Sequence, residues 1–153
     1  MQQLELTPRW RGHFMRMAQL VSEMSKDPST KVGAVIVRPD RTVAATGYNG
    51  YPRACKDDDY TDRERKYQRI IHAEMNAILT ARERLDGYTL FTWPLPPCDR
   101  CMPHIIQSGI TRMFVPRITG DRWRGSCLAA QMMAVEAGLT VIELYDSEFQ
   151  DEG

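Results

Sequence analysis

His72, Glu74, Cys98 and Cys101 are residue types that could bind a metal ion and move protons beside it. One imidazole and two thiolates are three ligands of the kind that zinc prefers, whereas structural zinc sites are closed by four protein ligands. A set of three leaves one position for water, as in catalytic zinc sites. These residues therefore predict zinc-dependent hydrolysis, with Glu74 as the proton carrier.

The spacing within each pair supports this prediction. Cys98 and Cys101 are three residues apart and would share one face of a helix, and the two prolines before Cys98 would mark its start. The positive end of that helix would favour the thiolate form that metal binding needs. His72 and Glu74 are two residues apart, about 200° around a regular helix, so they can share a pocket only at a helix start.

Each motif alone also has an ordinary interpretation. CxxC occurs in redox pairs and as half of a structural zinc site, and HAE is a common helical tripeptide. Their order, with a proline before the first cysteine and a predicted strand between the motifs, favours the catalytic interpretation. Cys55 and Cys127 match no tight ligand spacing with His13 or His104, so we expect free buried thiols and one zinc ion per chain.

The composition favours a small-molecule enzyme over a nucleic-acid or membrane protein. A chain of 153 residues with a formal net charge of zero is expected to form one domain, 1–153, without a polyanionic partner. The sequence contains no long apolar run, so neither secretion nor membrane insertion is expected, and a cytoplasmic location is predicted. In that compartment the four cysteines are expected to stay reduced. The acidic tail at about 146–153 is expected to be disordered.

Alternating segments with helical and strand patterns predict an α/β fold. The expected helices span 9–25, 70–85, 98–107 and 127–137, and the expected strands span 32–37, 42–46, 88–93, 113–115 and 139–144. The charged stretch 51–66 has no sustained period and is expected to be a long loop. Strands that alternate with helices of this length favour a three-layer α/β/α sandwich, in which helices cover both faces of a buried sheet.

The motifs resemble those of a known enzyme family. HAEMNAIL from His72, PCDRC around Cys98 and SGI from Ser108 are similar to the cytidine deaminase superfamily, whose signature is HxE followed by PCxxC. SKDPSTKVGAVI from Ser25 and GYNG from Gly47 resemble more closely the deoxycytidylate deaminase family. The resemblance runs from about 14 to 144. It implies a cytidine deaminase-like fold with a mixed five-stranded sheet, one catalytic zinc per subunit, and often a homo-hexamer.

The resemblance also implies a reaction and its catalytic residues. The family hydrolyses dCMP to dUMP and ammonia, which supplies dUMP for thymidylate synthesis. His72, Cys98 and Cys101 would be the zinc ligands. Glu74 would take a proton from the attacking water, deliver it to N3 of the ring and then protonate the departing amine.

Substrate contacts follow from the same resemblance. Asn49 matches a family asparagine expected to hydrogen-bond the sugar, and the backbone at Val32 and Ala73 would help to hold the base. Lys26 and Thr30 lie in a stretch that contacts the nucleotide in the family, although a lysine beside an aspartate is often only a solvated charge.

The segment GDRWRG at 120–125 is expected to recognise a phosphate. Arginine matches phosphate geometry with paired donors, and an aromatic ring can pack on a base, so Arg124 and Trp123 are predicted substrate contacts. The family usually has tyrosine where Trp123 stands, which leaves the nucleotide specificity open. The alternative is a solvated arginine loop with ordinary tryptophan packing.

Many family members are activated by dCTP and inhibited by dTTP through the GYNG loop. The resemblance therefore implies an allosteric role for Tyr48, Asn49 and Gly50, although GYNG is also a good turn sequence. The aspartates at 57–59 could bind Mg²⁺ together with a nucleoside triphosphate effector, or form a solvated loop.

Two other functions stay open from the sequence. The chain could deaminate another cytosine or purine compound, such as cytosine, cytidine, a guanine-type base or a tRNA adenosine, although zero net charge argues against tRNA. It could also be a nonenzymatic zinc-binding assembly subunit. Glu74 speaks against that alternative, because a structural site does not need an uncoordinated carboxylate beside its ion.

Overall fold

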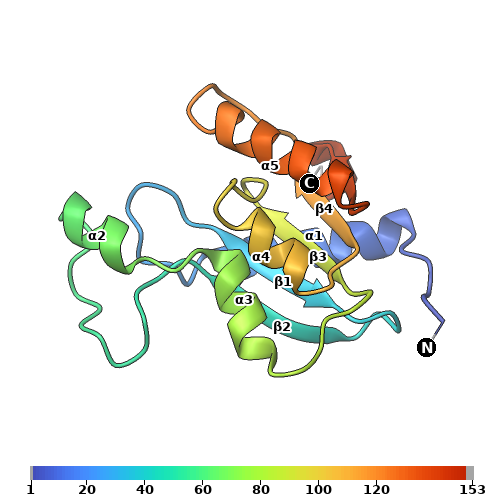
Figure 1. Cartoon of the computed structure of the whole chain (residues 1–153), viewed down its shortest axis with the longest axis horizontal. Coiled ribbons are helices and arrows are strands. Elements are labelled where there is room, and N and C mark those ends of the chain that lie inside the picture. Colours follow the sequence, from blue (N-terminus) through green and yellow to red (C-terminus); the bar gives the residue numbers. More distant parts are fainter. Residues whose placement is uncertain (1, 151–153) are drawn as a thin grey trace.

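A five-stranded mixed sheet forms the centre of the computed structural model, which describes residues 2–150 (Figure 1). The strands lie in the order β2-β1-β3-β4-β5. β1 is antiparallel to both of its neighbours, whereas β3, β4 and β5 run parallel. Their bounds are Gly33–Val37 (β1), Val43–Tyr48 (β2), Thr89–Trp93 (β3), Arg112–Pro116 (β4) and Thr140–Leu144 (β5). The mixed five-stranded sheet implied by the family resemblance is confirmed.

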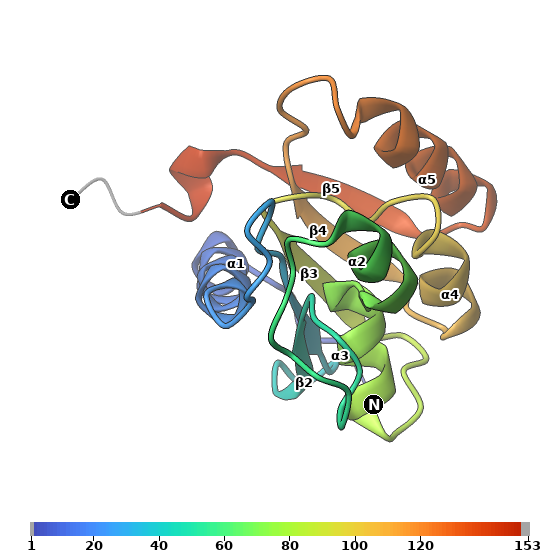
Figure 2. The same cartoon turned by 90° about the vertical axis from the view of Figure 1, so that its left-hand side faces the viewer.

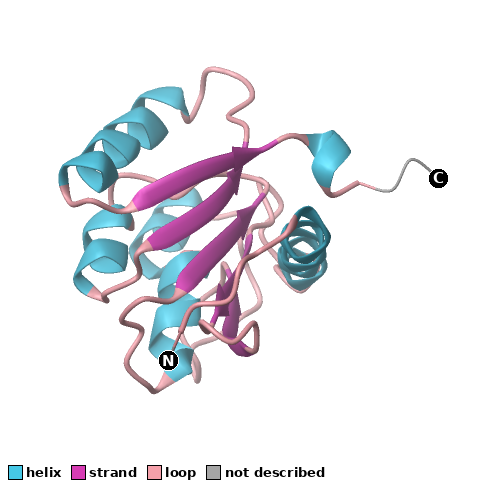
Figure 3. Cartoon of the chain, turned by 90° about the vertical axis from the view of Figure 1, so that its right-hand side faces the viewer, coloured by secondary structure: helices cyan, strands magenta, loops and turns pink. Residues whose placement is uncertain are grey.

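Helices cover both faces of this sheet. Figure 2 shows α1 alone on one face and α3, α4 and α5 on the other, and Figure 3 shows the same layers from the opposite side. The helix bounds are Pro8–Ser22 (α1), Arg63–Arg69 (α2), Ala73–Ala81 (α3), Met102–Gln107 (α4) and Arg124–Glu136 (α5). The predicted three-layer sandwich is therefore confirmed. Within residues 2–150, no helix is both long and apolar enough to cross a bilayer.

Two glycines allow helices to approach the sheet closely. A Cβ atom at Gly33 would lie 2.0 Å from the carbonyl oxygen of Ala18 in α1. A Cβ atom at Gly47 would lie 2.4 Å from the backbone of both Ala73 and Ala77 in α3. Because backbone atoms cannot yield at such distances, side chains at these two positions would displace the helices. Gly47 thus fixes the start of α3 against β2.

Several boundaries differ from the sequence prediction. The helix expected at 70–85 spans only Ala73–Ala81, and the helix expected at 127–137 already begins at Arg124. The helix expected at 98–107 begins only at Met102. Pro103 has no N–H to donate to a carbonyl of a preceding turn, so it is tolerated in the first turn of a helix but not in its interior. The loop expected at 51–66 contains the start of α2, whose N-cap Asp62 accepts from the Arg65 amide. α2 has no buried residue, so it shows no apolar period. The helix expected at 9–25 ends at Ser22.

The expectation that the tail is disordered from 146 onward is wrong for 146–150. Asp146–Glu148 form a 3-10 helix (η1), and Phe149 is only 1% exposed. Phe149 packs into the apolar cluster between α1 and the sheet, which includes Phe14 and Phe114. Burial of this one aromatic side chain anchors the segment despite its acidic neighbours. Residues 151–153 lie outside the described part of the chain.

Candidate metal centre and substrate pocket

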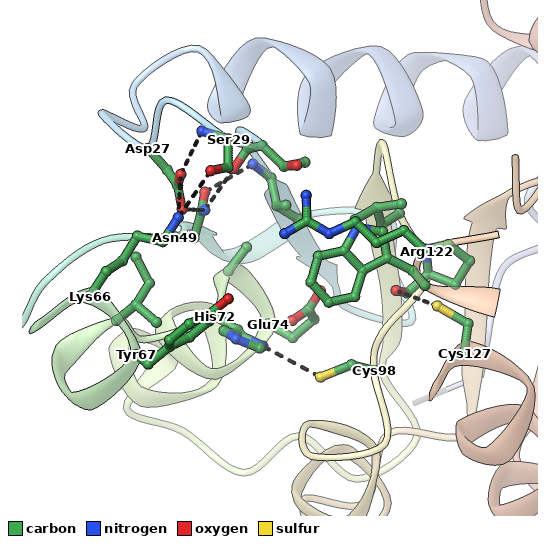
Figure 4. Close-up of a pocket in the computed structure, with 17 residues that line it drawn as sticks. Asp27, Ser29, Asn49, Lys66, Tyr67, His72, Glu74, Cys98, Arg122 and Cys127 are labelled. Carbon is green, nitrogen blue, oxygen red and sulfur yellow. Dashed lines mark hydrogen bonds and ion pairs between the residues drawn. The ribbon is translucent and has the colours of Figure 1, made fainter. Parts of the chain in front are cut away.

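His72 is the residue immediately before α3, and Glu74 lies in the first turn of that helix. The backbone at His72 is extended, with φ −68° and ψ 155°. The side chains of His72 and Glu74 are therefore not turned about 200° apart, as they would be within a regular helix. A two-residue bridge between Gly50 and Ile71 holds the incoming segment, with the Ile71 amide donating to the Gly50 carbonyl at 2.8 Å. Both His72 and Glu74 line one pocket (Figure 4), as the helix-start prediction required.

Cys98 and Cys101 lie in the tight turn before α4. The amide of Cys101 donates to the carbonyl of Cys98 at 3.2 Å, and this turn brings both sulfurs toward His72. His72 Nδ1 lies 3.2 Å from Cys101 Sγ and 3.4 Å from Cys98 Sγ. The three ligand atoms lie within 4.8 Å of one another. Ligands of a tetrahedral zinc ion are about 3.5 Å apart, so the donor set fits zinc in both chemistry and spacing.

The two thiols share their protons unequally. A hydrogen bond from Cys101, helped by His72, lowers the pKa of Cys98 to about 4. The same bond to Cys98, together with burial, raises the pKa of Cys101. The hydrogen bond with Cys98 also raises the pKa of His72. In the metal-free chain Cys98 is therefore the thiol that favours the thiolate form.

Glu74 is close to the donor group but is not a member of it. Its side chain is 4% exposed, and burial raises its pKa. Among residues 2–150, no further His, Cys, Asp or Glu joins the group of His72, Cys98 and Cys101. A three-donor group with a buried carboxylate beside it can bind an ion, leave a position for water and transfer protons.

The pocket above this group contains most of the predicted substrate contacts. Val32, Thr30, Asn49, Ala73 and Trp123 all line it. Asn49 is held firmly, because its Oδ1 accepts from the Val32 amide at 2.9 Å and its Nδ2 donates to the Thr30 carbonyl at 2.9 Å. One side chain thus joins the end of β2 to the segment before β1 and shapes this wall.

The structure does not bring four predicted residues to the pocket. Lys26 pairs with Asp57 at 2.9 Å on the surface. Arg124 is more than half exposed, and its nearest acidic partner is Asp121 at 3.7 Å. Tyr48 and Gly50 are also absent from the lining, and Gly50 instead forms the bridge to the His72 segment.

Sequence reasoning missed the rim of the pocket. Lys66 and Tyr67 of α2 line it together with Ile70, the C-cap of that helix, and Arg122 lines it from the loop before α5 (Figure 4). Asp62 as an N-cap was the signal available in the sequence for the helix itself, but no local pattern marked the face that lines the pocket. Arg122 is adjacent to Trp123, and its guanidinium lies 4.9 Å from the indole ring.

The rim is electropositive. Tyr67 accepts a hydrogen bond from Arg63 at 3.1 Å. That bond and the charges of Arg63, Arg122 and Lys66 lower the pKa of Tyr67. An anionic group of a ligand would be stabilised beside these residues.

The three aspartates at 57–59 each have another partner. Asp57 pairs with Lys26 and accepts from the hydroxyl of Tyr60, and Asp58 pairs with Arg65 at 3.2 Å. Asp59 accepts from both the amide and the hydroxyl of Thr61. They form no metal-binding group within the described residues, so Mg²⁺ binding here stays a prediction without structural support.

Comparisons with known proteins point to one family. Residues 8–116 match the family described as the cytidine and deoxycytidylate deaminase zinc-binding region. An uncharacterized deaminase from the luxG 3' region of Aliivibrio fischeri is 43% identical over 137 residues, covering 87% of this chain and 92% of that protein. The deoxycytidylate deaminase of Homo sapiens is 34% identical over 141 residues, covering 86% and 77%.

A solved structure gives the same result. The dCMP deaminase from the cyanophage S-TIM5, in complex with dCMP and dUMP, matches with a TM-score of 0.72 and 26% sequence identity. The match covers 92% of this chain and 100% of that chain. The similarity therefore extends over nearly all elements that build the pocket.

Proposed function

Because this chain belongs to the cytidine and deoxycytidylate deaminase family, we propose that it hydrolyses dCMP to dUMP and ammonia as a single zinc-dependent deaminase domain. The observation that carries the proposal is the buried Glu74 beside the three-donor group of His72, Cys98 and Cys101, in one pocket. Product dUMP would feed thymidylate synthesis.

A zinc ion held by this group would lower the pKa of a bound water molecule toward neutrality. Glu74 accepts the proton of the attacking water and gives it to N3 of the cytosine ring as the C4–O bond forms. Glu74 then takes the remaining proton from the hydroxyl on C4 and delivers it to the departing amine, as the C4–N bond breaks and the C4=O bond forms, so one water is consumed and one ammonia leaves. Burial raises the pKa of Glu74 and so suits it to both accepting and donating within one cycle.

The rest of the pocket suits a nucleotide that enters with its base toward Glu74. Val32 and Ala73 lie on the wall beside the metal centre, where their backbone would hold the base. Trp123 offers an aromatic face for the base. Asn49 has one oxygen lone pair left beside its bond to the Val32 amide and is our candidate for the sugar contact.

We assign the phosphate contact to Arg122 in place of Arg124. Among the ionisable rim groups, Lys66 already pairs with Asp27 at 3.1 Å, whereas Arg122 makes no ion pair within residues 2–150. A free guanidinium at an electropositive rim supports binding of a phosphate with paired hydrogen bonds. Lys66 adds positive charge nearby, and Thr30 is a second polar candidate on this wall.

Ammonia release from dCMP, deoxycytidine, dCTP and cytosine by the zinc-loaded protein tests this proposal, with Glu74→Gln as the inactive control. We expect turnover of dCMP to exceed that of the other compounds. Equal rates on dCMP and deoxycytidine would remove the phosphate assignment but keep the chemistry. Absence of turnover on every cytosine compound would contradict the proposed substrate class.

We also propose that the chain forms a homo-oligomer, with a hexamer favoured by the family resemblance. Exposed apolar side chains on one face of α5 support association, because Leu128, Met132 and Val135 are 46%, 74% and 74% exposed at helical spacing. Sedimentation of the purified protein tests this. A monomer at micromolar concentration would contradict it.

Regulation and location stay predictions. Effects of dCTP and dTTP through Tyr48, Asn49 and Gly50 would appear as a sigmoidal rate curve that dCTP makes hyperbolic. A hyperbolic curve without dCTP, insensitive to its addition, would count against allostery. Mg²⁺ would bind to the chain only together with such a nucleoside triphosphate effector. A cytoplasmic location is likewise a prediction.

A further inference from the structure

The turn that carries Cys98 and Cys101 is fastened to the first turn of α5. The backbone amide of Asp99 donates to Ser126 Oγ at 3.1 Å, and Ser126 Oγ donates in return to Asp99 Oδ1 at 2.9 Å. This reciprocal pair holds the residue immediately after Cys98. It bridges two segments that are 27 residues apart in the sequence.

The next residue of α5 contacts the other side of the same turn. Cys127 Sγ lies 3.6 Å from the carbonyl oxygen of Pro96, two residues before Cys98 (Figure 4). Cys127 is 1% exposed, and Ala130 and Ala134 bury the same helix against the core. The first turn of α5 is thus anchored and contacts the chain on both sides of Cys98.

The same short segment also forms a wall of the pocket. Arg122 and Trp123 line the pocket, and Trp123 is the N-cap of α5, three residues before Ser126. A shift of this turn relative to α5 would therefore change the position of the Cys98 sulfur and its distance from the pocket wall. The contact of Ser126 with Asp99 opposes that shift.

We propose that Ser126 is a positioning residue for the metal-ligand turn: its hydroxyl holds Asp99, and thereby keeps Cys98 where its sulfur meets the other two donors. This inference rests on the zinc site of the proposed function. Residues that orient metal ligands typically change metal affinity by about 10–100-fold when they are replaced. Ser126 acts on the backbone beside the ligand, at a partly exposed position, so we expect about tenfold.

Competition with a chromogenic chelator measures zinc affinity without substrate. Ser126→Ala should bind zinc about tenfold more weakly than wild type, and Ser126→Thr, which keeps the hydroxyl, should restore the affinity. Ser108→Ala is the matched control, because its hydroxyl bonds the Ile105 carbonyl at the far end of α4. The cobalt-loaded protein adds a second readout, since altered thiolate-to-cobalt absorption in Ser126→Ala reports a displaced sulfur.

Asp99→Ala sharpens the test, because it removes the carboxylate acceptor but keeps the amide donor. Its loss of affinity should be smaller than that of Ser126→Ala, and the double variant should lose no more than Ser126→Ala alone. Wild-type affinity in Ser126→Ala would overturn this inference alone. Failure of the wild type to bind zinc would overturn the proposed function and this inference with it. Should Ser126→Ala fail to fold, an unchanged affinity in Asp99→Ala overturns the inference.

Discussion

Lys66 Nζ lies 3.1 Å from Asp27 Oδ1, and this ion pair joins α2 to the turn before β1 at the pocket rim. The two side chains are only 12% and 8% exposed, so the pair is shielded from solvent. Because α2 has no buried residue of its own, this contact is central to holding its pocket-lining face in place.

We expect Asp27→Ala to destabilise the fold more than Lys66→Met. Asp27 also accepts from the Ser29 amide at 2.8 Å and from Asn49 Nδ2 at 3.3 Å, so its loss leaves several donors without an acceptor. The free energy of unfolding should fall by about 3 kcal/mol for Asp27→Ala. It should fall by about 1 kcal/mol for Lys66→Met. Urea unfolding measures both, and equal losses would mean that the bonds to Ser29 and Asn49 add nothing.

Arg122→Ala should weaken binding of dCMP, whereas Arg124→Ala should not. Loss of a charge-assisted contact costs about 2 kcal/mol, which corresponds to a rise in KM of about thirtyfold. The KM for deoxycytidine, which has no phosphate, should stay unchanged in both variants. Steady-state kinetics on the two substrates compare these neighbouring arginines directly. A larger effect from Arg124 would return the phosphate contact to the residue predicted from the sequence.

Trp123→Ala should raise the KM for dCMP and for deoxycytidine alike. Stacking of a base on an aromatic ring contributes about 1–2 kcal/mol, so the rise should be about tenfold for each substrate. Trp123→Tyr, which installs the usual family residue, should stay near wild type. If Trp123→Ala affected only dCMP, the indole would instead be acting through its contact with Arg122.

Zinc uptake by the metal-free protein should release protons and weaken as the pH falls. The pKa of Cys98 is lowered to about 4, so this thiol is already ionised at neutral pH, whereas the raised pKa of Cys101 keeps its proton in place. Zinc binds thiolates and neutral imidazole, so Cys101 must lose its proton. Affinity should therefore rise about tenfold per pH unit for each proton released.

Calorimetry in buffers of different ionisation enthalpy counts these protons. Cys101→Ala should lose zinc and the associated proton release. The expectation that Cys55 is buried is wrong, because this cysteine is exposed and lies outside the donor group, and Cys55→Ala is therefore the matched control. Uptake without proton release at pH 7 would contradict the unequal sharing of protons between the two thiols.

Glu74→Gln should lower kcat by about 10²–10⁴-fold while zinc content stays unchanged. The amide keeps the size of the carboxylate but cannot carry protons, and Glu74 does not belong to the donor group. Turnover and metal analysis on the same preparation separate the two roles. Loss of zinc in this variant would assign Glu74 to metal binding.

Several features of the fold and the metal centre follow from local sequence. The placement of His72 and Glu74 at a helix start depends on residues two apart, and the convergence of Cys98 with Cys101 depends on residues three apart. Backbone geometry over one turn decides such relationships. The three-layer arrangement likewise follows from the alternation of strand and helix periods along the chain.

Other features depend on contacts between distant segments. The choice of Arg122 over Arg124, the pocket-lining face of α2 and the buried Phe149 all depend on which surface lies opposite, and no local period encodes that. The contact of Asp99 with Ser126 joins the turn before α4 to the first turn of α5 through a single hydroxyl.

The sequence by itself determined the candidate donor set, the carboxylate beside it and the order of the elements, because these depend on residue chemistry and short-range backbone geometry. Only the tertiary structure decided which charged and aromatic side chains surround the pocket and what holds the ligand turn in place. Those contacts form between segments that meet only after the sheet and its helices have packed.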